Sequence, residues 1–387
     1  MSKSFDVVVI GGGLAGLSAT LHLQNKGVDV ALVEASDRTG GRVASDRIDG
    51  FICDRGFQLI NSKYPSLVEL DVIAELDFVP APKVIEISLG TSRRVIGDPR
   101  KAPLSALDKE TGTIPEKLAL LRFLLFAKPR AASIGQALHA FGTTYERVLR
   151  PFLTGVFLCD PDLVDFDYGV SIIKSFVSGT PGVPRLGVGQ LPEALSKRVE
   201  NLILHTRVER IKGGQLETSL GDINAKNVIV ATDPTTAAQL LDFPHAVLMT
   251  GCITWYHATE NNPSGTGRLL VDGQNRGPVI NSVVMSDISM AYSDSHMSLI
   301  SSTTGLGVTE SEVRRHLALM WGVDTRDWQL VAKYEIASAL PIHSPGKALT
   351  QPIKIGENLF VIGDHRSVPS QQGALFSGKL AAQLLLN

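Results

Sequence analysis

Residues 5–42 constrain the fold of this chain more than any other stretch. Residues 6–10 (DVVVI) form a short apolar run, typical of a strand that is buried on both faces. The sequence GGGLAG follows at once and fits the pattern G-x-G-x-x-G, and residues 17–26 then predict a helix that stops at Gly27. Residues 28–33 predict a second strand, which ends in Glu34. This order of strand, glycine turn, helix and strand predicts a dinucleotide-binding unit.

The residue types in this unit match the needs of a bound dinucleotide. Gly11 permits the tight turn, Gly13 lets backbone N–H groups approach a pyrophosphate at the helix N-terminus, and Gly16 lets the helix pack closely on the strand. Glu34 comes eighteen residues after Gly16, where an acid can accept hydrogen bonds from an adenosine ribose. A glycine-rich turn without a nucleotide is the alternative interpretation. The order of the elements favours the dinucleotide, but it does not separate FAD from NAD.

Two later motifs and the C-terminal segment carry a resemblance to a known family. The motifs are DRTGGR at residues 37–42 and DRGFQ at residues 54–58. Near the C-terminus, NLFVIGD at residues 358–364 predicts a strand before Gly363 and Asp364, and QGALFSG at residues 372–378 opens a final helix. Together with the first unit, these segments resemble the flavin amine oxidase and carotene (phytoene) desaturase superfamily.

The resemblance implies a non-covalent FAD and assigns residues of this chain to the different parts of the FAD molecule. The double glycine before Arg42 passes the FAD phosphates, residues 54–58 lie beside the isoalloxazine, and Asp364 meets the ribityl or phosphate region. The helix that starts at Gly373 and Ala374 points its positive end at the flavin N1/O2 edge, where reduction places negative charge. The residue matching Val208 meets the adenine through its backbone. The predicted cofactor-binding residues are Gly11, Gly12, Gly13, Leu14, Ala15, Gly16, Glu34, Ala35, Arg38, Gly41, Arg42, Gly56, Phe57, Gln58, Val208, Gly363, Asp364, Gly373 and Ala374.

The predicted fold class is α/β, with a Rossmann-like FAD-binding domain and an inserted α+β substrate domain made of a sheet floor and a helical cap. The FAD-binding domain is expected to be discontinuous, comprising residues 1–62, 187–245 and 353–387. The substrate domain is expected to comprise residues 63–186 and 246–352. Helices are predicted at 64–78, 114–127, 133–141 and 145–158, a strand pair at 84–95, and mostly strands from 249 to 340. Residues 202–211 are predicted to form a single strand.

The tract LALLRFLLFAKPR at residues 118–130 is apolar nearly all round and ends in cations. Such a helix is usually buried, and we expect burial here. The alternative is an interfacial helix that touches a lipid bilayer and makes a peripheral membrane contact.

Composition excludes several classes of protein. The net charge of −2 gives no reason to expect a nucleic-acid partner, and the three scattered cysteines show neither metal spacing nor a C-x-x-C pair. The first strand begins within six residues of the N-terminus, and no apolar run reaches the ~18–20 residues of a membrane span. We therefore expect a cytoplasmic chain with no metal. No pattern indicates an oligomeric state.

The residues that are missing narrow the chemistry. Monoamine oxidases carry a lysine at the position that matches Gly251 and a tyrosine just before the closing helix, where residues 368–372 read VPSQQ. No cysteine near the C-terminus could hold FAD covalently. His343 and His365, with Gln58, are expected near the flavin face, and both histidines are more typical of polar lining than of a base.

We therefore predict a flavin oxidoreductase that abstracts a hydride from an apolar small molecule in a desaturase-type dehydrogenation. The alternatives are an amine oxidase that yields an imine and hydrogen peroxide, a non-redox flavin isomerase, and an FAD-binding protein without activity.

Overall fold

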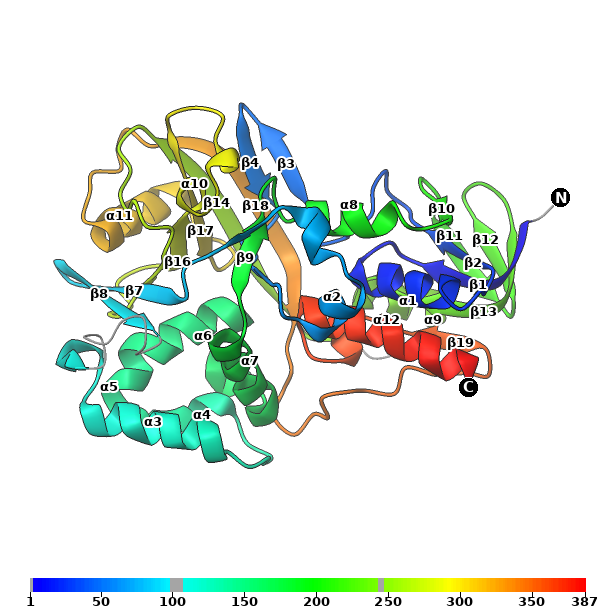
Figure 1. Ribbon diagram of the computed structural model, residues 1–387, viewed down its shortest axis with the longest axis horizontal. Coiled ribbons are helices and arrows are strands. Elements are labelled where there is room, and N and C mark those ends of the chain that lie inside the picture. Colours follow the sequence, from blue (N-terminus) through cyan, green and yellow to red (C-terminus); the bar gives the residue numbers. More distant parts are fainter. Residues whose placement is uncertain (1–2, 98–106, 243–246) are drawn as a thin grey trace.

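The computed structural model describes residues 3–97, 107–242 and 247–387 (Figure 1). Two large sheets lie at opposite ends of the molecule, and a group of helices lies beside the second sheet (Figure 1). The predicted α/β class is confirmed. The predicted division into two domains stays a prediction.

The first sheet has seven strands and contains β1 and β19, the first and the last strand of the described chain. Its order is β10 (Asn201–Ile203), β2 (Val30–Val33), β1 (Lys3–Ile10), β13 (Ile223–Val230), β12 (Gln215–Thr218) and β11 (Val208–Lys212), and β19 (Leu359–Val361) also pairs with β13. The pairs of β1 with β2 and β13, β2 with β10, and β13 with β19 are parallel. Residues 7–10 of β1 and all of β2 are apolar and buried, as expected of parallel strands that are covered on both faces.

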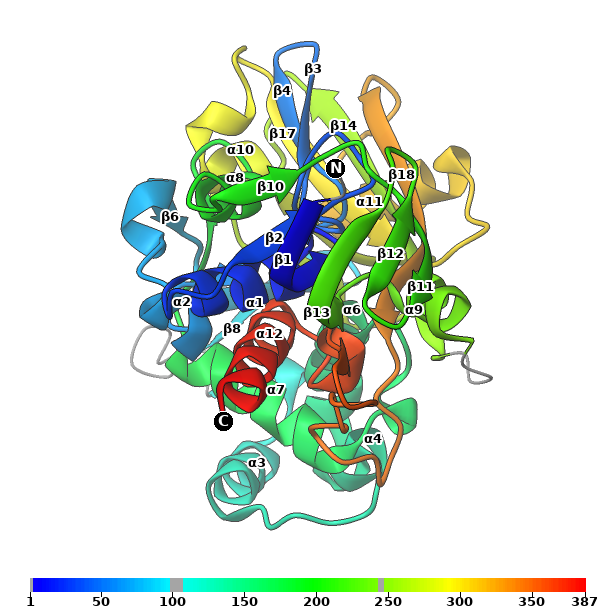
Figure 2. The same cartoon turned by 90° about the vertical axis from the view of Figure 1, so that its right-hand side faces the viewer.

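Helices α1 (Leu14–Gln24) and α12 (Gln371–Leu386) lie side by side against this sheet (Figure 2). Their approach is close because Gly378 has no side chain: a β-carbon there would stand 2.3 Å from the carbonyl oxygen of Ala15. Ser18 on α1 donates a hydrogen bond of 2.7 Å to the carbonyl of Leu375 on α12. The C-terminal helix is thereby fixed beside the glycine turn that precedes α1.

The second sheet also has seven strands. Its order is β18 (Gln329–Pro341), β14 (Met249–Thr259), β17 (Ser298–Thr304), β16 (Val279–Val284), β15 (Leu269–Asp272), β7 (Val84–Leu89) and β8 (Ser92–Gly97). All of these pairs are antiparallel except β15 with β7. Helix α11 (Glu310–Trp321) packs against this sheet through buried residues that include Val313 and Leu317.

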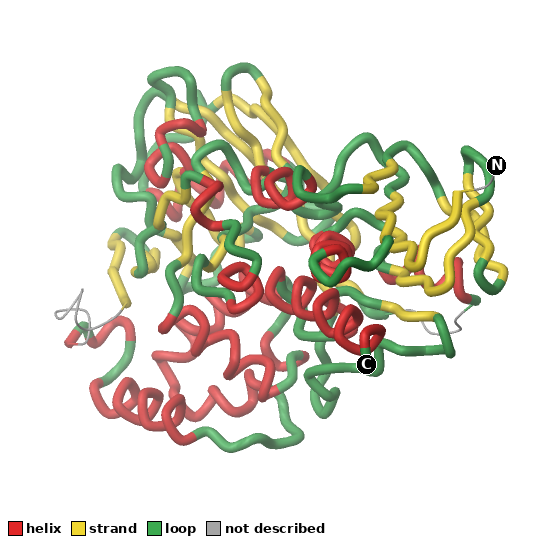
Figure 3. Tube along the Cα trace, turned by 45° about the vertical axis from the view of Figure 1, so that its right-hand side comes forward, coloured by secondary structure: helices red, strands yellow, loops and turns green. Residues whose placement is uncertain are grey.

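The helices of the cap gather below the second sheet (Figure 3). They are α3 (Ile114–Phe126), α4 (Ile134–Leu138), α5 (Gly142–Thr144), a π-helical turn (Tyr145–Leu149), α6 (Arg150–Phe157) and α7 (Phe166–Ser178). The structure also contains two small sheets. In one, β3 (Ser45–Ile48) pairs with β4 (Phe51–Asp54). In the other, β9 (Pro181–Pro184) pairs with β5 (Ile60–Asn61) and β6 (Phe78–Pro80). The remaining short helices are α2 (Pro65–Glu69), α8 (Gln190–Ser196), α9 (Pro234–Leu241) and α10 (Met285–Ile288).

Two predicted elements are wrong in the same way. The helix expected at 64–78 ends after α2, because Asp71 and Asp77 adopt positive φ angles of 47° and 45°. The single strand expected at 202–211 breaks at His205, whose φ is 53°. The two halves, β10 and β11, lie at opposite edges of the first sheet. The backbone N–H groups of residues 205 and 206 donate hydrogen bonds to the carbonyls of residues 36 and 34, so the chain passes the end of β2 between the two strands.

The prediction that the tract 118–130 is buried is also wrong. Helix α3 buries none of its residues fully. Leu120, Phe123 and Leu124 pack on the cap core, whereas the opposite face is exposed. We call this face the α3 surface, and it consists of Ile114, Leu118, Leu121, Leu125 and Phe126, which are 46–72% exposed. In the part of the chain that the structure describes, no helix is long and apolar enough to span a bilayer.

Candidate active site

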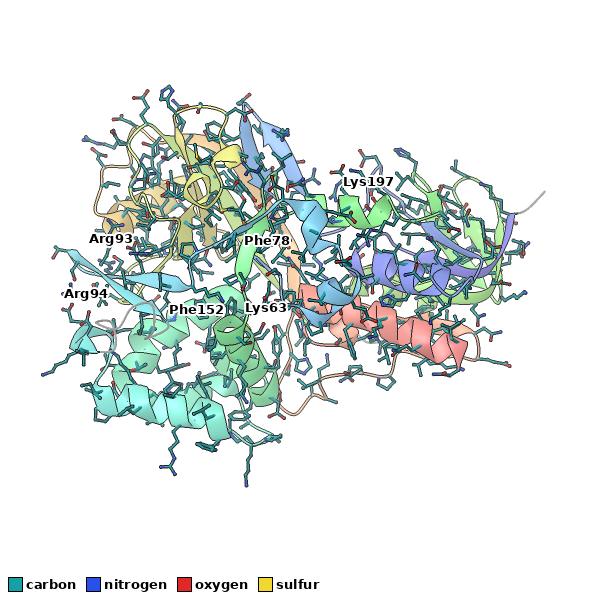
Figure 4. All side chains as sticks on the ribbon, in the orientation of Figure 1. Lys63, Phe78, Arg93, Arg94, Phe152 and Lys197 are labelled. Carbon is teal, nitrogen blue, oxygen red and sulfur yellow. The ribbon has the colours of Figure 1, made fainter. Side chains whose placement is uncertain are left out.

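A cavity of about 970 Å³ extends from the glycine turn of the first sheet to the floor of the second sheet. At one end it is lined by the residues of the glycine turn, the end of β2 and the loops around Arg42 and Asp364. At the other end its walls are mostly apolar. These walls consist of Val84, Ile85, Phe152, Val156, Leu158, Ile172, Phe176, Leu269, Ile336 and Leu340. Phe152 lies on α6, between the cap helices and the second sheet (Figure 4).

The glycine turn has the conformation that its sequence requires. Gly11 has a φ of 106°, and a β-carbon there would come 2.9 Å from the backbone of Ala231. A β-carbon at Gly16 would stand only 2.0 Å from the carbonyl oxygen of Gly11. Gly13 caps the N-terminus of α1 and lines the cavity, and no atom lies within 4 Å of the position of its missing β-carbon. The turn is therefore open on the cavity side at Gly13, where a phosphate can approach the helix N-terminus.

Glu34 lies beside this turn and lines the cavity. One carboxylate oxygen, Oε2, accepts a hydrogen bond of 2.7 Å from the backbone N–H of Gly12. The other, Oε1, accepts bonds of 2.8 Å from the backbone N–H and the hydroxyl of Ser36. A carboxylate offers about four acceptor positions, so the group retains capacity for a ribose hydroxyl.

Arg42 and Asp364 meet across the cavity, although 322 residues separate them. The guanidinium of Arg42 donates 2.7 Å hydrogen bonds to Oδ1 of Asp364 and to the carbonyl of Ala339. Burial lowers the pKa of the Arg42 guanidinium, but the Asp364 carboxylate outweighs burial and raises that pKa above its ordinary value. The cation is therefore held charged at the cavity wall.

Gln58 and Gln371 form a polar link next to this ion pair. Nε2 of Gln371 donates a hydrogen bond of 3.1 Å to Oε1 of Gln58, whose own Nε2 donates to the carbonyl of Arg42 at 3.0 Å. Oε1 of Gln371 is buried and has no partner among the described residues. An unpaired buried acceptor that borders the cavity fits a site for a bound cofactor with hydrogen-bond donors.

Most of the predicted cofactor-binding residues line the cavity. They are Gly11, Gly13, Leu14, Ala15, Glu34, Ala35, Arg38, Gly41, Arg42, Gly56, Phe57, Gln58, Val208, Gly363, Asp364 and Ala374. Gly12 and Gly16 stand behind the wall, where Gly12 bonds Glu34 and Gly16 packs on Gly11. The assignment of all these residues to cofactor binding, both those that line the cavity and the two behind its wall, stays a prediction.

The structure corrects the predicted start of the closing helix. The closing helix begins two residues earlier, at Gln371, with Ser370 as its N-cap. The backbone N–H of Gly373 donates to the hydroxyl of Ser370 at 3.0 Å, so it is not free to face a ligand. A β-carbon at Gly373 would stand 1.9 Å from the carbonyl oxygen of Val368. Glycine is therefore required here by the capping loop, and the helix end borders the cavity through Ser370, Gln371 and Ala374.

His343 and His365 lie behind the cavity wall and are absent from the lining residues. The ring of His343 lies 5.3 Å from that of Tyr168 and is 2% exposed. Burial lowers the pKa of both imidazoles, that of His365 to about 4, so both are neutral at pH 7. In the described part of the chain no histidine lines the cavity, and a catalytic role for either of these two stays a prediction.

Sequence reasoning missed two tyrosines of the cavity wall, one before α2 and one on the cap helix α7. Tyr64 and Tyr168 line the cavity, and the hydroxyl of Tyr168 donates to the carbonyl of Pro369 at 2.8 Å, immediately before the closing helix. Tyr168 belongs to α7, which was not predicted. The sequence contained a signal for this helix, because Asp165 is an N-cap residue that precedes an apolar pattern at residues 166–178.

Asp54 positions the segment that contributes Gly56, Phe57 and Gln58. Its carboxylate is fully buried and accepts hydrogen bonds from the hydroxyls of Ser45 (2.5 Å) and Tyr292 (2.7 Å) and from the backbone N–H of Val188 (3.0 Å). These partners come from separate parts of the chain. The carboxylate therefore ties the segment at the cavity wall to β3, to the loop before α8 and to the turn that ends at Tyr292.

Comparison with known proteins adds evidence beyond the geometry. The family model described as "Flavin containing amine oxidoreductase" matches residues 14–386. The carotenoid 3,4-desaturase of Haloarcula japonica is 47% identical over 51 residues, which are 13% of this chain and 10% of that protein. The protoporphyrinogen oxidase 2 of Arabidopsis thaliana is 24% identical over 200 residues, or 46% of this chain and 38% of that protein. The chain thus spans well under half the length of these curated relatives.

Solved structures match over nearly the whole chain. The cyclohexylamine oxidase of Brevibacterium oxydans superposes with a TM-score of 0.74 at 18% identity, covering 98% of both chains. At this identity the likeness shows the fold.

Proposed function

Because this chain belongs to the family of flavin-containing amine oxidoreductases, we propose that it binds FAD without a covalent link and removes a hydride from an apolar organic substrate. The observation that carries the proposal is one continuous cavity, which joins a dinucleotide-type glycine turn to apolar walls under the cap. Bound FAD would supply the hydride acceptor, and the protein supplies binding, orientation and exclusion of water.

The residues at the first-sheet end have chemistry suited to FAD. Glu34 offers acceptors for an adenosine ribose, Gly13 opens the N-terminus of α1 to a phosphate, and Arg42 provides a cation at the wall. The N-terminus of α12 borders the cavity at Ser370 and Gln371 and favours negative charge there. Cys252 lines the substrate end, where burial raises the pKa of its thiol to about 11. A protonated thiol is a poor nucleophile, which favours a non-covalent cofactor.

The substrate end favours the dehydrogenation of a C–C bond. The acidic residues that line the cavity within the described chain are Glu34, Asp233 and Asp364, and all three lie at the first-sheet end. No carboxylate of the described chain therefore lines the substrate end, and this end provides shape and water exclusion, as a hydride transfer from an apolar substrate requires.

Cofactor extraction tests the first part of the proposal. The protein is denatured in acid, and the released cofactor is identified by mass. Intact FAD in the supernatant is the expected result. Release of FMN or NAD, or a flavin that stays on a tryptic peptide, would contradict it.

Anaerobic reduction tests the reaction. Apolar alkenes and alkanes are added to the flavin-loaded protein, and bleaching of the flavin is followed by the mass of the product. A product lighter by two hydrogens supports the proposal. Turnover with no change in mass indicates an isomerase instead.

Amine oxidation is the second candidate, and the two cavity tyrosines favour it. Tyr64 and Tyr168 place aromatic rings in the wall, and such rings attract a cationic amine. A primary amine that bleaches the flavin and then yields hydrogen peroxide in air would establish this reaction. A failure of all amines to bleach the flavin would remove it.

We also propose that the α3 surface binds a lipid bilayer that carries anionic lipid. Its apolar residues are exposed, and the cations Arg122, Lys128 and Arg130 lie on or just after the same helix. Arg130 lies over the ring of the buried Phe166 at 4.2 Å, which holds this cation beside the cap core. Apolar side chains flanked by cations match the chemistry of an anionic bilayer surface.

Flotation with vesicles of phosphatidylserine and phosphatidylcholine tests this surface. The wild-type chain should float with the vesicles at low salt, and the double variant Leu121→Glu and Leu125→Glu should not. Leu220→Glu, at an exposed leucine far from α3 in the sequence, is the matched control and should float like wild type. A wild-type chain that stays in the lower fraction would refute the proposal.

A further inference from the structure

Three neighbouring strands bring three polar side chains into one row on the cavity wall. Thr254 on β14 stands directly opposite Thr303 on β17, and Thr303 stands directly opposite Asn281 on β16. Residues directly opposite in an antiparallel pair point to the same face of the sheet. All three line the cavity, so the row belongs to the floor of its apolar end.

The oxygen atoms of this row have no hydrogen-bond partner among the described residues. They are Oγ1 of Thr254, Oγ1 of Thr303 and Oδ1 of Asn281, and the three side chains are at most 4% exposed. The thiol of Cys252 is within hydrogen-bonding reach of the Thr254 hydroxyl, but a thiol is only a weak hydrogen-bonding group and leaves this hydroxyl poorly satisfied. Because buried polar atoms are nearly always paired in proteins, three unpaired ones in a row point to a missing partner.

The surroundings limit what that partner can be. The walls near the row are apolar and include Phe152 and Val156 of the cap helix α6. The row itself contains no charged side chain, and an ion without a counter-charge is costly to bury. On α6, Gly155 leaves room for the amide of Asn281, since a β-carbon there would stand 2.7 Å from Nδ2. The space beside the row therefore suits a neutral group.

We propose that Thr254, Asn281 and Thr303 form a polar subsite that binds a neutral hydroxyl, carbonyl or amide group of an otherwise apolar substrate. The proposal rests on the proposed function, because it deepens the description of the same cavity. Threonine hydroxyls and an asparagine amide both donate and accept hydrogen bonds, so the row can satisfy any of these groups. Binding there fixes how far an apolar molecule enters the cavity and which of its C–H bonds faces the flavin end. A site built in this way rejects analogues that lack the polar group.

Ligand binding to the flavin-loaded protein tests the subsite without any turnover. Octan-1-ol, octan-2-one and octane are titrated by calorimetry into wild type and into the double variant Thr254→Val and Thr303→Val. Valine has nearly the shape of threonine, so the variant loses the hydroxyls and keeps the walls. The alcohol and the ketone should each bind about tenfold more weakly to the variant, and the affinity for octane should stay the same. An equal change for all three ligands, or no change for any, would overturn the proposal.

Thermal unfolding of the protein without added ligand provides the second test, because two adjacent threonines differ in their bonding. Thr303 has an unpaired hydroxyl, whereas Thr304 on the opposite face accepts a hydrogen bond of 3.1 Å from Nε1 of Trp255. Thr303→Val should leave the melting temperature unchanged or raise it, and Thr304→Val should lower it. If both variants lower it equally, an ordered water already satisfies Thr303 and the subsite is refuted. A protein that binds the alcohol at this row and yet never bleaches its flavin would refute the proposed function alone.

Discussion

Asp54 should give the protein a stability that depends on pH in the direction opposite to ordinary carboxylates. Burial raises the pKa of this carboxyl from 3.8 to about 6, although the hydroxyls of Ser45 and Tyr292 and the N–H of Val188 act to lower it. The folded state therefore holds a proton at pH values where the unfolded chain has lost it. The stabilisation is complete below about pH 4 and is lost as the pH rises through 6.

The size of the effect follows from the shift of about 2 pKa units. At 1.36 kcal/mol per unit, Asp54 accounts for up to about 3 kcal/mol of unfolding free energy between pH 4 and pH 7. Asp54→Asn keeps the volume of the side chain and removes the titration. The unfolding free energy of wild type minus that of the variant should therefore fall by up to about 3 kcal/mol between pH 4 and pH 7.

Urea unfolding at constant ionic strength with excess flavin measures this difference, with the buried residues Trp255, Trp321 and Trp328 as fluorescent probes. Asp324→Asn is the control, because the hydrogen bonds from Arg326 lower the pKa of Asp324 to about 2 and the residue stays ionised from pH 4 to pH 7. Its stability should follow that of wild type across this range. Parallel curves for wild type and Asp54→Asn would refute the assignment of a raised pKa to Asp54.

Three further predictions concern the cofactor end of the cavity. Glu34→Ala should weaken FAD binding by roughly 1.5–3 kcal/mol, the range for a hydrogen bond to a charged group, and an unchanged affinity in a fluorescence titration would contradict the ribose assignment. Gly16→Ala should lower the melting temperature strongly, because a β-carbon would overlap the carbonyl of Gly11 at 2.0 Å, whereas Gly305→Ala meets no atom within 4 Å and should not. Gly373→Val should lower both the melting temperature and the flavin content, because the capping loop must move; full flavin content with an unchanged melting temperature and reduction potential would contradict this reasoning.

The sequence by itself determined the cofactor end of the cavity, because local sequence patterns specify the residues there. A glycine turn is specified by residues that follow one another, because Gly11, Gly13 and Gly16 act within one strand–turn–helix unit. Glu34 follows from the same unit, because it ends the next strand. The motif residues around Arg42 and Asp364 were found by resemblance, and the structure brings them within hydrogen-bond distance.

Only the tertiary structure decided which residues line the other end of the cavity. Thr254, Asn281 and Thr303 are ordinary strand residues in the sequence, and they form a row only because the register of β14, β17 and β16 aligns them. The exposure of the α3 surface likewise depends on which neighbours cover the helix, since its residues are apolar on both sides. Register and packing are set by contacts between segments far apart in the chain, and a local pattern contains no record of them.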